Sequence, residues 1–291
     1  MKENIYIVSD FFIDEYVGGA ELSTSSLISY CDKECIEVKS RQVTLDMLSN
    51  NRESTWIFTN FSLLNPQLID YIAEHLVNYH IIEYDYKYCR YRLPQHPEHG
   101  GECNCESLPV GHLISKFYSS AKTLNWMSYD QMYHYHTKFP QLKNNNNFVL
   151  SSIFSQEDLE TIKELILETQ NTNMNSEILL LGSSSWVKGF DQAREYCEER
   201  NISAKVVWNV PYKDTLKLLA THRGIVYLPN GYDTCPRWVI EAKLLGCKVI
   251  DNHYVQHRNE LWFKKSANKI IKYLSDQPYY FWNRILNNEE C

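Results

Sequence analysis

The sequence predicts an α/β protein of two Rossmann-like domains, each a doubly wound parallel sheet, that face a central cleft. Short apolar runs alternate with amphipathic segments along the chain, as strands and helices alternate in an open parallel sheet. An asparagine-rich tract at residues 143–147 interrupts this alternation near the middle, and asparagine favours turns. The 291 residues are enough for two domains of roughly 130 to 150 residues each.

The first half shows four apolar runs and four amphipathic segments. We expect strands at residues 5–11, 56–61, 79–85 and 123–128. We expect helices at residues 18–30, 66–77, 113–122 and 131–138, the second of which has apolar residues at helical spacing. A long loop follows residue 85 and ends at about residue 112. We interpret the asparagine tract as a linker, which predicts domains at residues 1–150 and 151–291.

The second half repeats the alternation. We expect strands at residues 178–182, 204–210, 224–229 and 247–251. We expect helices at residues 157–169, 190–200, 212–222, 236–245, 267–274 and 279–286. Ser155 and Asp158 predict a capping box at the start of the first of these helices. The last helix is expected to pack back on the first domain.

Composition narrows the class of protein. The net charge of −7 and the pI of about 5.8 argue against nonspecific binding to nucleic acid or acidic lipid. Nine scattered cysteines do not suggest a secreted disulfide framework, so we expect reduced thiols. We find no run of apolar residues long enough for a membrane span, and residues 1–16 lack the pattern of a signal peptide. These features predict a cytoplasmic protein.

Three stretches at strand-to-helix turns carry candidate chemistry. The first contains Gly18 and Gly19, which follow the first strand and open a helix. Without side chains there, backbone amides can approach a phosphate, and the helix dipole favours the anion. The second runs from Gly182, at the end of a buried strand, to Lys188 at the next helix start. A lysine in that position supplies a point charge for a diphosphate.

The third stretch follows the strand expected at residues 224–229. Asp233 lies in the loop and Glu241 lies two turns into the following helix, so both carboxylates can face the cleft. Because carboxylates accept strong hydrogen bonds from hydroxyl groups, one can hold a sugar and the other a ribose. Singly, each stretch is also consistent with turn chemistry or a solvated side chain. Their order and spacing together favour a ligand site.

In this order, the three stretches resemble the retaining glycosyltransferases of the GT-B fold called family 4. The matching features are the Gly-Gly-x-Glu turn at Gly18, the Lys188-Gly189 pair, and an acidic pair, Asp233 and Glu241, that precedes a glycine and an apolar strand. The resemblance extends over nearly the whole chain. It implies a hexosyl- or pentosyltransferase that moves a sugar from a nucleoside-diphosphate sugar to a hydroxyl acceptor.

The resemblance also implies a role for each matching position. Lys188 would neutralise the diphosphate, Asp233 would hold the transferred sugar and Glu241 would bind the ribose. Asp85, at the end of a first-domain strand, would lie near the reaction centre, so Lys188, Asp85 and Asp233 are the candidate catalytic residues. The implied donor contacts are Gly18, Gly19, Gly182, Lys188, Trp208 and Asn209 at the base, Asp233, the amides of Thr234 and Cys235, and Glu241.

Two positions depart from the family pattern. An arginine usually precedes the lysine, whereas this chain has serines at residues 183–185; Arg237 is the candidate replacement. Asp233 stands where the family usually has glutamate, which leaves the donor sugar open. Retention in this family is usually explained by departure of the nucleotide on the face that the acceptor attacks. We therefore expect no side-chain nucleophile and no catalytic metal, only positioning and charge neutralisation.

The loop at residues 83–105 is not typical of that family. Cys89, His99, Cys103 and Cys105 within it are candidate ligands of a structural zinc. A long loop with little apolar content also needs a cross-link or another contact to hold its conformation. The spacing is not a standard pair of zinc ligands, so unrelated thiols and a surface histidine are the alternative.

The same loop interleaves tyrosines with Lys87, Arg90 and Arg92. This pattern is typical of surfaces that stack on bases and pair with phosphates. A nucleic-acid acceptor, such as a modified base, is therefore a second hypothesis beside a glycan or small-molecule acceptor. The acidic composition favours packed tyrosines and solvated cations instead. A third hypothesis, suggested by the missing arginine, is a module that binds a nucleotide sugar without turnover.

Overall fold

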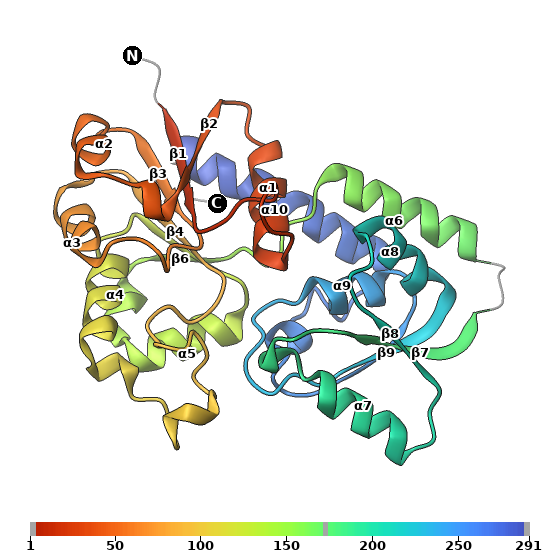
Figure 1. The fold of residues 1–291 in the computed structure, drawn as a ribbon. Coiled ribbons are helices and arrows are strands. Elements are labelled where there is room, and N and C mark those ends of the chain that lie inside the picture. The colour runs from red at the N-terminus through yellow and green to blue at the C-terminus, as the bar shows by residue number, and fades with distance from the viewer. Residues whose placement is uncertain (1–3, 171–173, 288–291) are drawn as a thin grey trace. The chain divides into compact units, whose positions relative to one another are not determined.

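The computed structural model describes residues 4–170 and 174–287, and the chain forms two compact units. The first unit comprises residues up to Ile153 together with those from Gln277 onward, and the second spans Phe154–Asp276. Each unit is built on one parallel sheet with helices on its faces (Figure 1). The predicted α/β class with two Rossmann-like sheets is confirmed.

The first unit holds a six-stranded sheet in the order β2-β1-β3-β4-β5-β6, and every neighbouring pair is parallel. The strands are β1 (Ile5–Ser9), β2 (Cys35–Lys39), β3 (Thr55–Phe58), β4 (Tyr79–Glu83), β5 (Thr123–Trp126) and β6 (Asn146–Val149). The helices are α1 (Gly19–Ser29), α2 (Leu45–Asn50), α3 (Pro66–His75), α4 (Pro109–Ser119), α5 (Tyr129–Lys138) and the end of α10 (Ala267–Asn287).

The core of the first unit is aromatic. Tyr6 of β1 stacks on Trp56 of β3 with ring centroids 4.2 Å apart. Phe58, Tyr79 and Phe117 continue the cluster toward α4. Since β1, β3 and β4 are buried along their whole length, helices must cover both faces of the sheet, as parallel sheets require.

The second unit holds a four-stranded parallel sheet in the order β10-β9-β7-β8. Its strands are β7 (Asn175–Leu181), β8 (Ala204–Val207), β9 (His222–Tyr227) and β10 (Lys248–Asp251). Its helices are α6 (Gln156–Thr169), α7 (Phe190–Glu199), α8 (Tyr212–Thr221), α9 (Arg237–Leu244) and the start of α10. In Figure 1, α7 covers one face of this sheet and α6, α8 and α9 gather on the other. The predicted capping box of Ser155 and Asp158 is present.

Three expectations about secondary structure are wrong. The short elements β2 and α2 are absent from the predicted set, since residues 31–50 have weak apolar periodicity. The asparagine tract is no linker: it ends a 3₁₀ turn at Pro140–Asn144 and begins β6. The two closing helices are one continuous helix, α10, with Pro278 inside it. In the described helices of residues 4–170 and 174–287, none has the length and apolarity of a membrane crossing.

The side chains of these asparagines hydrogen-bond to backbone carbonyls. The side-chain amide of Asn145 donates to the carbonyls of Tyr118 and Ser119, each at 3.1 Å, at the carboxyl end of α4, where carbonyls have no partner within the helix. Asn147 donates to Leu142 O at 2.8 Å and accepts from Trp126 Nε1 at 2.8 Å. Asparagine therefore serves here as a cap and as an edge-strand residue, and composition alone does not show this.

One buried histidine predicts a pH-dependent stability. Burial, with a smaller effect of Lys122, lowers the pKa of His80 from 6.5 to about 3. Between pH 6.5 and 3 the unfolded chain binds a proton that the folded protein does not, so stability falls as the pH falls. We expect a loss of about 1.4 kcal/mol in unfolding free energy per pH unit from this group.

Replacing His80 by glutamine should make that slope shallower by the same amount, measured by urea unfolding at several pH values. Replacing the exposed His75 by glutamine is the control. Parallel curves for the His80→Gln variant and the unaltered protein would contradict the assignment.

Candidate active-site residues

The strand order locates a candidate site in each unit. In both sheets the second strand lies on one side of the first and the third strand lies on the other. The side on which successive strands join the sheet therefore reverses at the neighbouring strands β1 and β3, and again at β7 and β9, while all strands stay parallel. Because the crossovers leave in opposite directions there, the region outside the carboxyl ends of the two strands is where α/β folds bind ligands.

In the second unit, the turn after β7 is fastened to the segment after β9. The turn is a 3₁₀ turn at Trp186–Lys188. Asn230 donates its backbone amide to Val187 O at 3.0 Å and its side-chain amide to Trp186 O at 2.7 Å. Gly189 has a left-handed φ of 64°, and a Cβ there would overlap the carbonyl of Leu228. The glycine after the lysine is therefore required by close packing.

This turn places Lys188 beside Asp233. Lys188 Nζ lies 2.7 Å from Asp233 Oδ2, and the Tyr227 hydroxyl donates to the same carboxylate oxygen. Burial and the Asp233 charge raise the pKa of Tyr227, so that it stays a donor. The backbone of Asp233 is fixed by bonds to Tyr254 O at 2.9 Å and from Gln256 N at 3.1 Å. The Lys188 side chain is 33% exposed, so its ammonium is accessible to an anion.

Trp208 and Gly182 lie together at the end of the same sheet. The Trp208 ring packs against Gly182, where a Cβ would come within 2.7 Å of the ring. The indole is still 48% exposed, and the next residue, Asn209, has a left-handed φ of 52°. A large, half-exposed ring packed against a glycine is suited to stacking on a planar base.

Arg237 and Glu241 form a separate, buried network. Glu241 accepts from Tyr212 OH at 2.9 Å and from Arg237 Nε at 3.4 Å. Arg237 Nη2 also donates to Asp158 at 2.9 Å, and its guanidinium lies 4.0 Å from the centroid of the Phe154 ring. Burial raises the pKa of Glu241, although Arg237 opposes the shift. The charge of Arg237 is thus matched inside the unit by two carboxylates.

The loop between these two networks reaches α9. Thr234 and Cys235 are buried just before the helix, and its N-cap, Pro236, makes no side-chain capping bond. The position of their amides at a helix start is compatible with phosphate binding, which stays a prediction.

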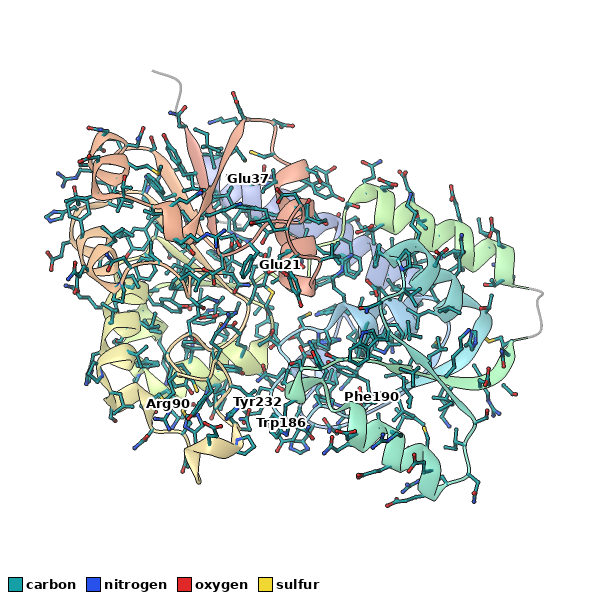
Figure 2. All side chains as sticks on the ribbon, viewed as in Figure 1. Glu21, Glu37, Arg90, Trp186, Phe190 and Tyr232 are labelled. Carbon is teal, nitrogen blue, oxygen red and sulfur yellow. The ribbon has the colours of Figure 1, made fainter. Side chains whose placement is uncertain are left out.

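In the first unit, the predicted glycine pair opens α1. Gly18 is the N-cap of the helix and Gly19 its first residue. A Cβ at Gly18 would come within 2.6 Å of a Glu21 carboxylate oxygen, whereas Gly19 faces open space. Glu21, labelled on α1 in Figure 2, is buried and hydrogen-bonds Asn60, and burial raises its pKa. A Cβ at Gly18 would thus displace the Glu21 and Tyr16 side chains, and Gly19 leaves the helix start accessible.

Asp85 belongs to a charge network at the carboxyl end of β4. Arg92 Nε donates to Asp85 Oδ2 at 2.5 Å, and Arg92 Nη2 donates to Asn60 Oδ1 at 3.0 Å. Lys87 Nζ lies 3.1 Å from Asp85 Oδ1. Burial acts to raise the pKa of Asp85, but the two cations outweigh it and hold that pKa at about 2. Asp85 is therefore ionised at neutral pH, with its side chain 23% exposed.

A buried carboxylate lies beneath Asp85. Glu83 lies 2.9 Å from Lys87 Nζ, and it accepts from the hydroxyls of Tyr118 and Tyr135. It also accepts from the backbone amide of Asp85 at 2.9 Å. Because both carboxylate oxygens of Glu83 have hydrogen-bond partners, this buried side chain holds the end of β4 rigidly.

The structure forms only part of the surface of tyrosines and cations that the nucleic-acid hypothesis requires. Tyr86 and Tyr88 are fully buried, and the Lys87 side chain is 2% exposed between two carboxylates. Arg92 is paired with Asp85. Arg90, labelled on the loop before α4 in Figure 2, lies over the Tyr91 ring. The aromatic residues pack because the loop needs a core, so the pattern does not show a nucleic-acid surface.

The same loop gathers the four predicted metal ligands. The ligand atoms of Cys89, His99, Cys103 and Cys105 all lie within 4.8 Å of one another. The three cysteines are buried and His99 is partly exposed. The loop therefore holds a Cys/His cluster that has room for a metal ion.

Several polar residues of these networks were not predicted as site residues from the sequence. They are Tyr227, Tyr212, Asp158, Glu83 and Asn60. Tyr227 and Glu83 end buried strands, which is a usable signal, because the carboxyl end of a parallel strand is where ligands bind. Tyr212 and Asp158 carry no such signal, since their partners come from distant helices.

Comparison with known proteins supports the fold. No protein-family model matches the sequence, and no curated protein matches it either. Matching solved structures include one from Escherichia coli described as trehalose-6-phosphate bound with UDP-2-fluoro glucose, at TM-score 0.53 and 8% identity over 98% of this chain and 96% of that one. Another is a UDP-forming α,α-trehalose-phosphate synthase from Burkholderia xenovorans in complex with glucose-6-phosphate, at TM-score 0.56, 8% identity and coverages of 98% and 92%.

A third similar structure is the N-terminal domain of a Candida albicans trehalose-6-phosphate phosphatase, at TM-score 0.56 and 8% identity, with coverages of 97% and 98%. The likeness therefore extends over both sheets of this chain. It shows that the chain has the GT-B fold, the architecture of two Rossmann-like units found in many glycosyltransferases. At these identities the likeness establishes the fold alone.

The packing of the lysine turn can be tested with two glycines. Replacing Gly189 by alanine should destabilise the second unit by more than the ~1–2 kcal/mol of a left-handed alanine, because its Cβ also overlaps Leu228. Gly246→Ala is the matched control, since Gly246 has a φ of 83° but open space around it. Equal losses in unfolding free energy for the two variants would contradict this packing.

Proposed function

We propose that the protein transfers a sugar from a nucleoside-diphosphate sugar, held by the second unit, to a hydroxyl acceptor. One observation carries the proposal: the accessible ammonium of Lys188 lies 2.7 Å from Asp233 at the β7–β9 reversal. A cation at this place can pair with a diphosphate. The adjacent carboxylate can accept hydrogen bonds from sugar hydroxyls. The pair thus suits a ligand that joins a diphosphate to a sugar.

The neighbouring residues favour a nucleoside on the same ligand. Trp208 offers a half-exposed ring against Gly182, which suits base stacking. The family 4 resemblance implies Glu241 for the ribose, but this side chain is buried and paired with Tyr212 and Arg237, so the proposal does not place the ribose there. The description of the E. coli structure names a UDP sugar, which makes UDP-glucose a reasonable first donor to test.

The proposed reaction breaks the bond between the anomeric carbon and the diphosphate oxygen. The electron pair of that bond stays on the diphosphate, whose added charge Lys188 offsets. The acceptor oxygen bonds the anomeric carbon on the same face, and its proton passes to the departing phosphate. The configuration is thereby retained, and no side-chain nucleophile takes part. Catalysis then consists of positioning and charge stabilisation.

Arg237 does not share this task in the proposal. Its guanidinium is buried and faces Asp158 and Glu241, so replacing the missing family arginine would require breaking two ion pairs. Among the predicted donor residues, the diphosphate charge therefore falls to Lys188 and to backbone amides. This makes Lys188 a sharper test than it would be in a site with two cations.

Removing the ammonium should weaken donor binding. We expect Lys188→Ala to lower the affinity for UDP by about 10- to 100-fold, corresponding to ~1.5–3 kcal/mol for a charged hydrogen bond. The measurement is calorimetric titration with UDP, after thermal-shift screening of several nucleoside diphosphates. Lys213→Ala is the control, since Lys213 pairs with Glu157 on the surface.

The outcomes separate the hypotheses. Donor hydrolysis or sugar transfer that Lys188→Ala abolishes supports an enzyme, and the anomeric configuration of the product, determined by NMR, tests retention. Tight binding with no turnover on any acceptor supports a binding module. Absence of binding by every nucleoside diphosphate contradicts the proposal.

Asp85 belongs in the proposal as the residue that orients the acceptor hydroxyl. It is ionised and partly exposed, and Lys87 and Arg92 fix it from two sides. We expect Asp85→Asn to lower kcat roughly 100-fold, the scale of lost positioning, with the Kd for UDP unchanged. Asp70→Asn, at an exposed ion pair with Lys116, is the control. A parallel loss of UDP affinity would assign Asp85 to the donor instead.

A further inference from the structure

We propose that Cys89, His99, Cys103 and Cys105 bind one Zn²⁺ ion, and that this ion holds the loop between β4 and α4 in place. The four ligand atoms lie within 4.8 Å of one another, and Cys89 Sγ is 3.1 Å from His99 Nε2. All four come from one segment without regular strands or long helices. The proposal does not depend on the activity inferred for the second unit.

The distances suit a tetrahedral ion. With Zn–S of about 2.3 Å and Zn–N of about 2.0 Å, neighbouring ligand atoms of a tetrahedral site with three sulfurs and one nitrogen lie roughly 3.5–3.8 Å apart. The cluster therefore needs to contract by no more than about 1 Å at its widest separation. Three thiolates and an imidazole form a set common in structural zinc sites, whereas a catalytic zinc keeps a position open for water.

Two of the sulfurs accept hydrogen bonds from backbone amides. Backbone amides of Tyr91 and Leu93 hydrogen-bond to the sulfur of Cys89, and the amide of Cys105 bonds to that of Cys103. Such outer-shell bonds orient metal ligands.

Charge balance points the same way. A Zn²⁺ ion with three thiolates carries a net negative charge. Lys138 Nζ donates to the carbonyl of Cys103 at 3.1 Å and pairs with Glu106 at 2.8 Å. This ammonium is shared with Glu106 and, at 3.8 Å, with Glu102, so it offsets the extra charge only in part.

The distal part of the loop is held by exposed or half-exposed contacts, such as the stacking of Tyr91 on His96. Tyr86, Tyr88 and Leu93 are buried close to β4, but residues from His96 to Gly101 form an exposed 3₁₀ turn with no buried residue. Closing a loop from Cys89 to Cys105 by a cross-link removes many unfolded conformations. Neutral thiols would supply only weak packing and no closure.

The loop also carries Arg92, which reaches Asp85. The amide of Arg92 donates to the carbonyl of Cys89 at 2.8 Å, and Arg92 has a left-handed φ of 56°, a conformation that costs a non-glycine residue free energy. The metal ligand and the strained arginine thus share one turn. Binding of zinc at Cys89 would hold the guanidinium against Asp85 and Asn60, so the ion acts by positioning.

The test starts from the metal content of the full chain, purified under reducing conditions. We expect about one zinc ion per chain, measured by inductively coupled plasma mass spectrometry. Cys89→Ser, Cys103→Ser and Cys105→Ser should each lower that content severalfold. Cys31→Ser, in the same unit, and Cys197→Ser, in the second unit, are matched controls that should retain it.

Two further measurements keep the test decisive where a serine variant does not fold. Replacement of the metal in the unaltered protein by Co²⁺ should give the absorption bands of tetrahedral, thiolate-bound cobalt. Removal of the metal by a chelator should lower the melting temperature, and added Zn²⁺ should restore it.

Three results would overturn the proposal. One is folded, reduced protein that contains no zinc and takes up neither Zn²⁺ nor Co²⁺. Another is a disulfide among these cysteines in folded protein that was purified without reductant. The third is full zinc content in all three serine variants. UDP binding in the second unit can succeed or fail whatever the metal content, so the two proposals fail separately.

Discussion

The parallel arrangement of strands is the constraint on which both units depend. Every strand enters its sheet from the same end, so all the loops that follow strands gather at one edge. Because the first strand of each sheet lies between the second and the third, the crossovers part at β1 and at β7. The polar side chains after these strands and their neighbours, Lys188 and Asp233 in one unit and Asn60 and Asp85 in the other, lie at that edge for this reason.

Burial then decides what each cation can do. Lys87 and Arg237 are enclosed by carboxylates and tyrosines, where an unpaired charge would be costly. Both therefore fix neighbouring groups and are poorly suited to exchanging partners with a ligand. Lys188 pairs with one carboxylate, that of Asp233, and its side chain is one-third exposed. An incoming anion can therefore pair with this ammonium at a small cost in desolvation. All three residues carry a positive charge, and they differ in how deeply their side chains are buried.

Backbone conformation connects these sites to their scaffolds. Gly189 lets the lysine turn lie against Leu228, and the amides and side chain of Asn230 lock it there. In the first unit, Arg92 adopts a left-handed conformation beside a cysteine of the Cys/His cluster. In both places a short turn with special backbone geometry presents a cation to a carboxylate. Cross-linking of the second turn by a metal would do what close packing does in the first.

The sequence alone determined the alternation of strands and helices, the lysine and acidic positions of the second unit, and the four members of the Cys/His cluster. These follow from local rules: apolar periodicity, glycines at turns, and residue types that bind metals. Only the tertiary structure decided that Arg237 is matched internally, that Tyr86 and Tyr88 are core, and that the asparagine tract caps α4 and enters the sheet. Each of these depends on partners far away in the chain, such as Asp158 for Arg237, and a local pattern carries no information about the depth at which a side chain will lie.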